Sequence, residues 1–412
     1  MKTHFYLILF SSSLLISLIV TGKSIRWAHS WGILDEPGER KVHTTTKPRI
    51  GGLGIAAGFF LTVIAAVLLA AYLPLELVPS FFRETIASNR SGIRSQALSF
   101  IGLMGGGLIV FAAGFLDDCK NLSPKMKLTW ETVGVLFLIG TGFRLDFHKV
   151  IWNDPMGEYL LSIPVTALWI LFLINAFNLL DNMDGLSAGV CAITTTFFGI
   201  YAHWMGEYFL AGAMACLVGA LLGFLRYNWH PSKIFMGDGG ALLIGFLVAA
   251  FTCKCTYFKS TPDSVLDWFF PSRGATAEQG LLTLLTPLVI MAVPIFDTTS
   301  VILIRLKNRK PIKPFLLVGT DHGRGHQPFF ASIGRARDES EERGGGDLLG
   351  DDIHRFGGPD STDRLGDPSH AYLPTSALRF RNDPGSRTWT QKDPSGRKQD
   401  FRRRLMGIFS GP

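Results

Sequence analysis

Long apolar segments alternate with short polar loops along the chain up to about residue 304. Each segment is long enough to cross a bilayer core of about 30 Å as a helix, and is too continuous for the strands of an outer-membrane barrel. We therefore predict an all-α polytopic membrane protein. Its nine predicted spans lie near 4–22, 51–74, 98–116, 129–143, 161–177, 186–204, 207–226, 240–256 and 281–304. No clear cleavage motif follows the first span, so we expect it to be a retained helix rather than a signal peptide.

Composition agrees with this prediction. Hydrophobic residues make up 47% of the 412-residue chain and charged residues 18%, whereas charged residues make up about 25% of a typical soluble protein. The five cysteines have no ligand-like spacing, and we expect buried thiols without a disulfide framework. The net charge of +7 bears on membrane orientation and anionic lipids, and no nucleic-acid partner is expected.

The loops divide into two sets with different chemistry. Alternation of nine spans places 23–50, 117–128, 178–185, 227–239 and the segment after 304 on one face. Lys and Arg are more numerous on that face, so it is expected to be cytoplasmic, with the N-terminus outside and the chain in the plasma (inner) membrane. The same loops hold almost every unusual polar cluster. We therefore predict one composite active site on the cytoplasmic face.

The character of the sequence changes near residue 322. The segment that follows is rich in charged residues, Gly and Pro, as in GRARDESEERGGGD, and has no run long enough to span a bilayer. Such a composition buries too little apolar surface to offset the entropy of ordering. We predict a membrane domain over 1–322 and a disordered tail over 323–412. Because the change is abrupt, a frameshift or truncation near 322–330 is one hypothesis for it.

An acidic pair ends the third span. Asp117 and Asp118 repel each other unless a cation or solvent compensates them, and Lys120, Lys125 and Lys127 follow closely. Carboxylate oxygens suit Mg²⁺, and ammonium groups suit phosphate oxygens. The alternative is a solvated helix end that terminates the span.

A second cluster lies in NAFNLLDNMDGLSAG at 175–189. Asn178, Asp181 and Asp184 are spaced i, i+3, i+6, which would place them on nearly one face of a helix. A calcium loop of the EF-hand type is excluded, because Ala192 stands where its twelfth-position Glu is needed. The alternative is a polar turn between two helices, although a turn does not need so many Asn and Asp residues.

Two further polar segments complete the predicted site. In NWHPSKIFMGDGG, Asp238 precedes two glycines and a new apolar helix, so it is either a functional carboxylate or an ordinary helix N-cap. The loop at 40–49 is strongly basic, either for function or as a positive anchor at the membrane. Together the clusters supply carboxylates and cations but no Ser-His-Asp or Cys-His nucleophile set. This inventory is typical of phosphoryl transfer, where positioning and charge neutralisation dominate.

Four ordered motifs resemble one known family. DEPGERKVHTTTKPRIGG, GFLDDCKNLSPKMKL, NAFNLLDNMDGLSAG and NWHPSKIFMGDGGALLIG are similar to those of the polyprenyl-phosphate N-acetylhexosamine-1-phosphate transferases, over about 30–322. The resemblance implies transfer of a sugar-1-phosphate from a UDP-amino sugar to an isoprenoid phosphate, expected to be undecaprenyl phosphate in the membrane lipid. UMP would be released and a cell-envelope polysaccharide initiated. It also implies dependence on Mg²⁺, with Mn²⁺ as a substitute, and is consistent with a homodimer.

The resemblance also assigns site residues. Metal ligands would be Asp238 and Asp118; catalytic residues would be Asp117, Asp118, Asp181, Asp184 and His322; substrate-binding residues would be Lys125, Asn178, Asn228, Phe235, Arg49 and His43. Asp117 is the candidate base or acceptor-positioning group. Since a phosphate monoester has its second pKa near about 6 and is mostly dianionic at pH 7, we favour its direct attack on the sugar-linked phosphorus. A covalent aspartyl-phosphate at Asp117 is the alternative.

Several alternatives stay open. Pro-Arg-Ile-Gly-Gly at 48–52 is similar to branches that use UDP-GlcNAc, whereas the phospho-MurNAc-pentapeptide transferase branch usually has Pro-Thr-Met-Gly-Gly. After KPFLLVGTDH the family pattern stops: His326 is one place off the expected spacing, and no role is carried to it. A truncated inactive homologue is therefore a second interpretation. A membrane transporter is a third, although transporter sites usually lie near the bilayer midplane.

Overall fold

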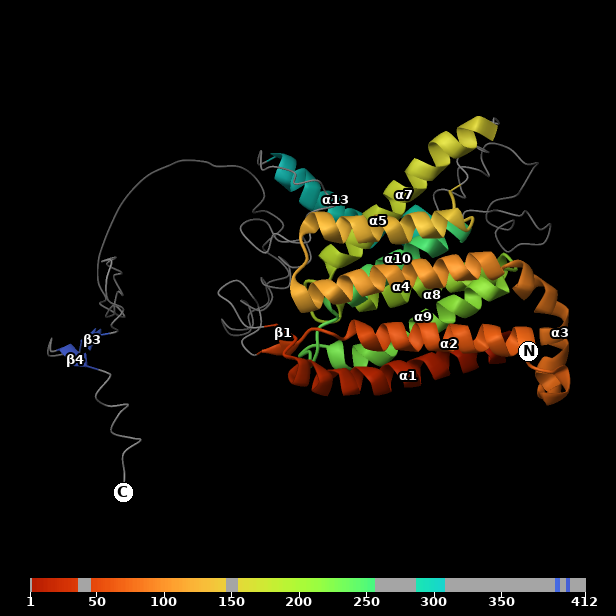
Figure 1. Cartoon of the computed structure of the whole chain (residues 1–412), viewed down its shortest axis with the longest axis horizontal. Helices are drawn as coiled ribbons and strands as arrows, with labels where there is room; N and C mark the ends of the chain where they lie inside the picture. Colours follow the sequence, from red (N-terminus) through yellow and green to blue (C-terminus); the bar gives the residue numbers. More distant parts are fainter. Residues whose placement is uncertain are drawn as a thin grey trace, which may run out of the picture. The chain divides into compact units, whose positions relative to one another are not determined.

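The computed structural model describes residues 2–35, 46–145, 155–255, 287–307, 390–392 and 398–400. The chain divides into two compact units, Met1–Gly346 and Asp347–Pro412. The described part of the first unit is a helical bundle (Figure 1). In the second, β3 (Thr390–Lys392) and β4 (Lys398–Asp400) pair antiparallel. The predicted boundary at 322 and the predicted disorder after it fall almost wholly outside the described residues.

The bundle follows the apolar runs of the sequence, and the predicted all-α class is confirmed. Its helices are α1 Lys2–Trp31, α2 Gly52–Tyr72, α3 Ser80–Ser95, α4 Ala97–Lys120, α5 Pro124–Gly140, α7 Pro155–Leu180, α8 Leu186–Trp204, α9 Tyr208–Asn228, α10 Gly237–Cys255 and α13 Ala292–Lys307. The 3₁₀ turn η1 spans Leu75–Leu77, and the strands β1 (Leu34–Asp35) and β2 (Lys47–Pro48) pair antiparallel. The structure thus describes a multi-pass helical membrane protein.

Seven of the described helices are long and apolar enough to cross a membrane: α1, α2, α4, α7, α8, α9 and α10. With 17 and 16 residues, α5 and α13 are shorter than the about 20 residues that a span needs. The predicted count of nine is therefore not confirmed. The first helix is also longer than predicted, because no Pro or Gly interrupts it between Lys23 and Gly32, where φ reaches 69°.

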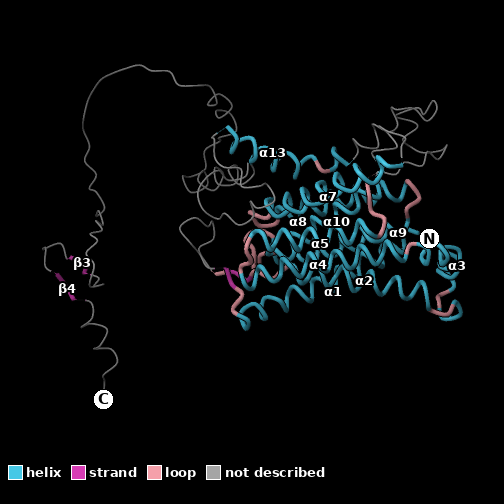
Figure 2. The backbone as a smooth tube through the Cα atoms, turned by 45° about the horizontal axis from the view of Figure 1, so that its top comes forward, coloured by secondary structure: helices cyan, strands magenta, loops and turns pink. Residues whose placement is uncertain are grey.

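Helix α10 lies at the centre of the bundle and packs against α2, α4, α7 and α8 (Figure 2). Almost all of its side chains are buried, including Phe246 and Phe251. Glycines allow the closest approaches: a Cβ on Gly52 of α2 would lie 2.4 Å from the backbone nitrogen of Gly240 in α10. Of the four cysteines whose side chains the structure describes, Cys191, Cys216 and Cys253 are buried as predicted, while Cys119 is exposed.

The two ends of the bundle differ. One end holds the C-termini of α4, α7 and α9 and the N-termini of α2, α5, α8 and α10, together with the polar loops between them. At the other end, the amphipathic helix α3 runs across the bundle (Figure 1). There, a cavity of about 270 Å³ is lined mostly by apolar side chains such as Leu9, Val67 and Phe82.

Candidate active site

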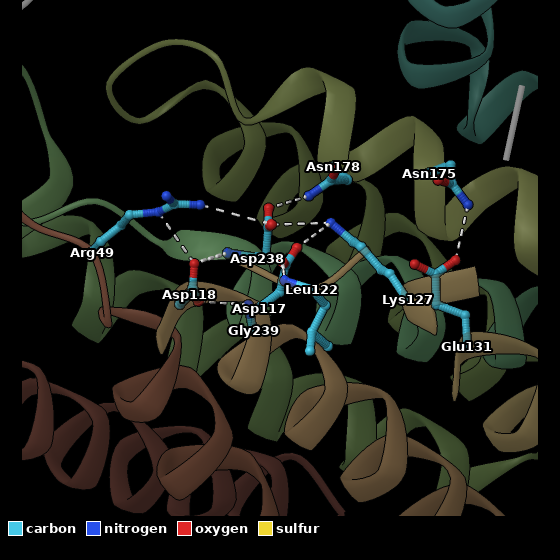
Figure 3. A network of polar contacts seen from close by, with 10 residues as sticks. All are labelled: Arg49, Asp117, Asp118, Leu122, Lys127, Glu131, Asn175, Asn178, Asp238 and Gly239. Carbon is cyan, nitrogen blue, oxygen red and sulfur yellow. Dashed lines mark hydrogen bonds and ion pairs between the residues drawn. The ribbon is translucent and has the colours of Figure 1, made fainter. Parts of the chain in front are cut away.

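The carboxylate of Asp238 is the centre of the polar end (Figure 3). It projects from the first turn of α10. Its Oδ2 accepts a hydrogen bond from Lys127 Nζ at 3.0 Å, and its Oδ1 accepts one from Asn178 Nδ2 at 2.8 Å. Arg49 Nη2 lies 3.7 Å from Oδ2. Residues from the β2–α2 connection, α5, α7 and α10 therefore converge on one carboxylate.

Asp118, near the end of α4, caps the start of α10 from outside the helix. Its Oδ1 accepts the Asp238 N–H at 2.9 Å, and its Oδ2 accepts the Gly239 N–H at 3.0 Å. Arg49 Nε lies 3.3 Å from Oδ1. The first N–H groups of a helix have no partner within the helix, so a carboxylate is stabilising there. Both oxygens of Asp118 thus join the end of α4 to the start of α10.

Asp117 stands beside it but has a different environment. Its Oδ1 accepts the Leu122 N–H at 2.7 Å, and its Oδ2 lies 3.2 Å from Lys127 Nζ. The chain can fold back here because Asn121 adopts a left-handed conformation with φ of 50°. Ser123 then caps α5, its side chain accepting the Met126 N–H at 3.3 Å, and Pro124 opens the helix. Lys127 consequently bridges Asp117 and Asp238.

Short backbone bonds place Arg49 over these carboxylates. Phe235 N–H donates to Pro48 C=O at 2.8 Å, and Gly51 N–H donates to Phe235 C=O at 2.9 Å. Gly237 has φ of 75°, and a Cβ there would lie 2.1 Å from the Arg49 carbonyl oxygen. Only glycine fits at this position. Burial alone would lower the pKa of Arg49, but the charges of nearby aspartates, Asp118 and Asp238 first, outweigh it and raise the pKa. The guanidinium therefore stays charged.

A second cluster surrounds Asp184. Its Oδ2 accepts the Ser232 N–H at 3.0 Å, its Oδ1 accepts the Ser232 hydroxyl at 2.7 Å, and His230 Nδ1 lies 3.1 Å from Oδ2. Lys47 Nζ is 3.7 Å away and lies 5.0 Å from the centre of the Phe235 ring. Burial alone would raise the pKa of Asp184, but the bonds from Ser232 outweigh it and hold the pKa below its usual value.

Asn228 joins the two loops of this second cluster. Its Oδ1 accepts the Gly185 N–H at 2.9 Å, and its Nδ2 donates to the Ile234 carbonyl at 2.9 Å. The side chain is buried. Its contacts within the chain are therefore structural, and they fix the turn that carries Asp184 relative to the segment that carries Phe235.

The helix α7 ends at Leu180, so only Asn178 of the predicted i, i+3, i+6 set lies on a helix. Asp181 and Asp184 belong to the turn that follows, which corrects the prediction of one helical face. Gly185, with φ of 73°, starts the next helix. Within the described residues, no hydrogen bond or ion pair reaches the Asp181 carboxylate, and burial together with the charge of Asp238 raises its pKa to about 7.

Lys125 is exposed and makes no side-chain contact with the aspartates, and the buried lysine at the site is Lys127. Sequence reasoning also missed Glu131, which is 1% exposed. One signal was available: Lys127, Glu131, Val135 and Leu138 share the helical spacing of the buried stripe of α5. His43 and His322 lie outside the described residues.

The donor set can be compared with the needs of a divalent cation. Among the residues that the structure describes, no three His, Cys, Asp or Glu side chains are grouped to hold a metal ion. Mg²⁺, however, usually takes one or two carboxylates and completes its shell with water and substrate phosphates. Asp117 and Asp238, which share one ammonium group, fit this requirement better than Asp118, whose two oxygens accept backbone N–H groups.

Fold and site together define a class: a polytopic helical membrane protein with a charged site at one end of its bundle. Comparison with known proteins identifies the family. The profile of glycosyl transferase family 4 matches residues 100–256. A "Probable undecaprenyl-phosphate N-acetylglucosaminyl 1-phosphate transferase" of Bacillus subtilis (strain 168) is 33% identical over 304 residues, covering 74% of this chain and 72% of that protein. The chain belongs to glycosyl transferase family 4.

Other relatives are similar over different lengths. A "Decaprenyl-phosphate N-acetylglucosaminephosphotransferase" of Mycolicibacterium smegmatis is 29% identical, covering 78% of this chain and 77% of the relative. A "Phospho-N-acetylmuramoyl-pentapeptide-transferase" of Thermoanaerobacter sp. is 35% identical, covering 37% of this chain and 51% of the relative. The family membership favours the transferase interpretation over the transporter alternative.

Proposed function

We propose that this protein transfers N-acetylglucosamine-1-phosphate from UDP-GlcNAc to undecaprenyl phosphate, releasing UMP and starting a cell-envelope polysaccharide. The observation that carries the proposal is the convergence of Asp117, Asp238, Lys127 and Arg49 at one end of the bundle. The relatives that match over most of both chains are named for transfer to a polyprenyl phosphate. The relative named for the pentapeptide-bearing sugar matches over a shorter segment.

The charges of the site suit a diphosphate donor. A divalent cation, Mg²⁺ in this proposal, would be held by Asp238 and Asp117 and would neutralise charge that develops on the diphosphate. Lys127 Nζ and Arg49 Nη2 lie 3.0 Å and 3.7 Å from Asp238 Oδ2. A diphosphate bound beside Asp238 would therefore be close to both positive charges, which would bind its oxygens. Phosphoryl transfer depends mainly on such positioning and charge neutralisation.

Direct attack by the lipid phosphate fits the site better than an aspartyl-phosphate. Both oxygens of Asp117 are engaged, one by the Leu122 N–H and one by the Lys127 ammonium group. A nucleophilic carboxylate would have to give up one of these contacts. The acceptor phosphate is mostly dianionic at pH 7 and needs no strong base, since its second pKa is about 6. Asp117 would then help to hold the metal ion rather than attack.

The second cluster is a candidate site for the nucleotide. The Phe235 ring is partly exposed and lies beside Lys47, while Asp184 is fixed by Ser232. Asn228 holds the two loops together. The arrangement supports a uridine site beside the phosphate site, as the resemblance of these residues implies.

We further propose that the site faces the cytoplasm, with the N-terminus outside and the protein in the plasma membrane. Lys and Arg residues are more numerous in the loops at the site end, and such residues remain on the cytoplasmic side. A homodimer remains part of this proposal and rests only on the resemblance.

The test uses membranes that contain the full chain, undecaprenyl phosphate, Mg²⁺ and UDP-[³H]GlcNAc. Transfer of label to the lipid phase, with UMP released in equal amount and no transfer after EDTA, is the expected result. UDP-MurNAc-pentapeptide serves as the competing donor: transfer from it alone would move the assignment to that branch. No transfer from either donor would support the truncated, inactive interpretation.

A further inference from the structure

Lys127 occupies a place where a metal ion is proposed to bind. Its Nζ lies 3.2 Å from Asp117 Oδ2 and 3.0 Å from Asp238 Oδ2, so one ammonium group neutralises two carboxylates. A divalent cation held by the same two carboxylates would lie close to this ammonium group. Two cations so close repel strongly in a poorly hydrated site. Lys127 must therefore move when the metal binds.

A displaced ammonium group needs another anion. Lys127 is 4% exposed, and a buried charge without a partner is costly. Its side chain is long and rotatable, so it can change partner while its helix stays in place. The phosphates of the donor would supply a partner only after the donor has bound.

Glu131 is the carboxylate that can take this ammonium group. It follows Lys127 by four residues on α5, and side chains at this spacing are neighbours on a helix. Glu131 is 1% exposed. Its Oε2 accepts a hydrogen bond from Asn175 Nδ2 at 3.1 Å, while its Oε1 accepts none from the described residues. Asn175 is itself fixed, since Nδ2 also donates to the Leu171 carbonyl at 2.9 Å.

Figure 3 shows where Lys127 and Glu131 lie relative to the proposed metal ligands. Lys127 extends toward Asp117 and Asp238, whereas Glu131 and Asn175 lie on its other side, away from Arg49. Among the described residues, the Asn175 amide bonds Glu131 and the Leu171 carbonyl but neither proposed metal ligand. A carboxylate in such a place has no part in holding the metal, yet it lies within the reach of Lys127.

We propose that Glu131 is a positioning residue that receives the Lys127 ammonium group when a divalent cation binds Asp117 and Asp238. This inference rests on the metal site of the proposed function. Lys127 stabilises the two carboxylates before the metal binds, and Glu131 stabilises Lys127 afterwards. The exchange also leaves Lys127 beside the site, from which it can approach the phosphates of an arriving donor.

The test measures Mn²⁺ binding to the purified full chain in detergent, without substrates, from the loss of the free-ion electron paramagnetic resonance signal. Four proteins form a cycle: the wild type, Glu131→Gln, Lys127→Met, and the variant with both changes. We expect Glu131→Gln to weaken Mn²⁺ binding about tenfold when Lys127 is present, because coupled neighbours of this kind interact strongly. With Met at position 127, the same change has little effect.

Three results would overturn the proposal. Equal weakening in both backgrounds would mean that Glu131 acts only through its charge. No weakening in the Lys127 background would mean that it plays no part. If the wild type binds no Mn²⁺ that Mg²⁺ displaces and that Asp238→Asn abolishes, the metal site itself fails. Glu207→Gln, at the opposite end of the bundle, is the matched control and should bind as the wild type does. Lys127→Gln replaces Lys127→Met if the latter does not elute as a folded protein.

Discussion

The two ends of the helix bundle are built in different ways. The ion pairs that join described residues all lie at the site end, around Asp118, Asp184 and Asp238. Close backbone approaches at glycines occur at the site end, at Gly52 and Gly237, and also along α1 and α9, at Gly219. The opposite end has an apolar cavity of about 270 Å³ beneath α3. Tyr6 and His203 form a hydrogen bond of 3.1 Å beside it.

This difference separates the end of the bundle where we propose that the chemistry takes place from the opposite end. Charges held against each other in a buried site are costly to bring together and need fixed backbones around them. The cavity at the opposite end is lined mostly by apolar side chains, so few charges have to be held in place there. Substitutions at the site end should therefore have large effects, and matched substitutions elsewhere small ones.

The largest effect is expected for Asp238→Asn. The change removes the charge that pairs with Lys127 and Arg49 and a proposed metal ligand. We expect transfer of labelled GlcNAc to lipid to fall by at least about 100-fold, as for other removed electrostatic groups in catalytic sites. Glu207→Gln at the opposite end should keep wild-type transfer. Activity in Asp238→Asn within a few-fold of the wild type would contradict the assignment.

Gly52→Ala tests the close packing at the site end. The added Cβ would lie 2.4 Å from the Gly240 nitrogen and 2.5 Å from its Cα, and backbone atoms cannot move aside. We expect a loss of about 3 kcal/mol, as for overpacked cores, measured by thermal unfolding in detergent. Gly189→Ala in α8 is the control, because its Cβ would meet no atom within 4 Å. That change should be neutral or stabilising by about 0.5–1 kcal/mol.

Asn228→Ala removes the link between the two loops of the second cluster. The Gly185 N–H and the Ile234 carbonyl lose their partner, and a buried polar group without a partner costs about 1–3 kcal/mol. Thermal unfolding should show a loss of about 2 kcal/mol. Asn182→Ala is the control, since Asn182 is exposed and its side chain bonds only the Leu179 carbonyl among the described residues. Equal losses in both variants would contradict the structural role of Asn228.

The smallest effect is a pH dependence that differs between two aspartates of one turn. The pKa of Asp181 is about 7 in the folded chain against 3.8 as its ordinary value. The folded state therefore holds this proton longer, and Asp181 makes stability fall as pH rises from about 4 to 7. The pKa of Asp184 is lowered, so its contribution is present above its ordinary pKa and is lost as pH falls through the folded value.

Melting temperatures of the two variants, measured in detergent with EDTA between pH 4 and 8, compare these contributions. Asp181→Asn should remove part of the decline toward neutral pH. Asp184→Asn should lower stability at neutral pH and flatten the loss in acid. Parallel profiles for the two variants would contradict the opposite pKa shifts of Asp181 and Asp184.

Much of the fold follows from the sequence, because a sufficiently long apolar run in a membrane forms a helix that satisfies its own backbone hydrogen bonds. The ends of the helices were harder to predict. Helix α1 continues through a polar segment to Trp31 because nothing before Gly32 stops it. The span count failed at α5 and α13, whose described helices are shorter than a membrane crossing.

The described parts of the four polar segments meet at one end of the bundle, as the sequence led us to expect. The individual partners were not predicted. Lys125 and Lys127 look equivalent in the sequence, but two positions on a helix point in different directions, and only Lys127 lies on the buried stripe with Glu131. The oxygens of Asp118 accept backbone N–H groups of Asp238 and Gly239, about 120 residues along the chain. No local pattern reveals such contacts.

The backbone bonds between the segment before α2 and the segment before α10 also bear on how the protein is made. Pro48 and Gly51 bond to Phe235, far along the chain. Closing so long a loop has an entropic cost that grows only slowly with its length. During synthesis, however, these bonds cannot form until the segment before α10 has been made. A chain that ended before α10 would lack both the backbone partners of Pro48 and Gly51 and the Asp238 carboxylate.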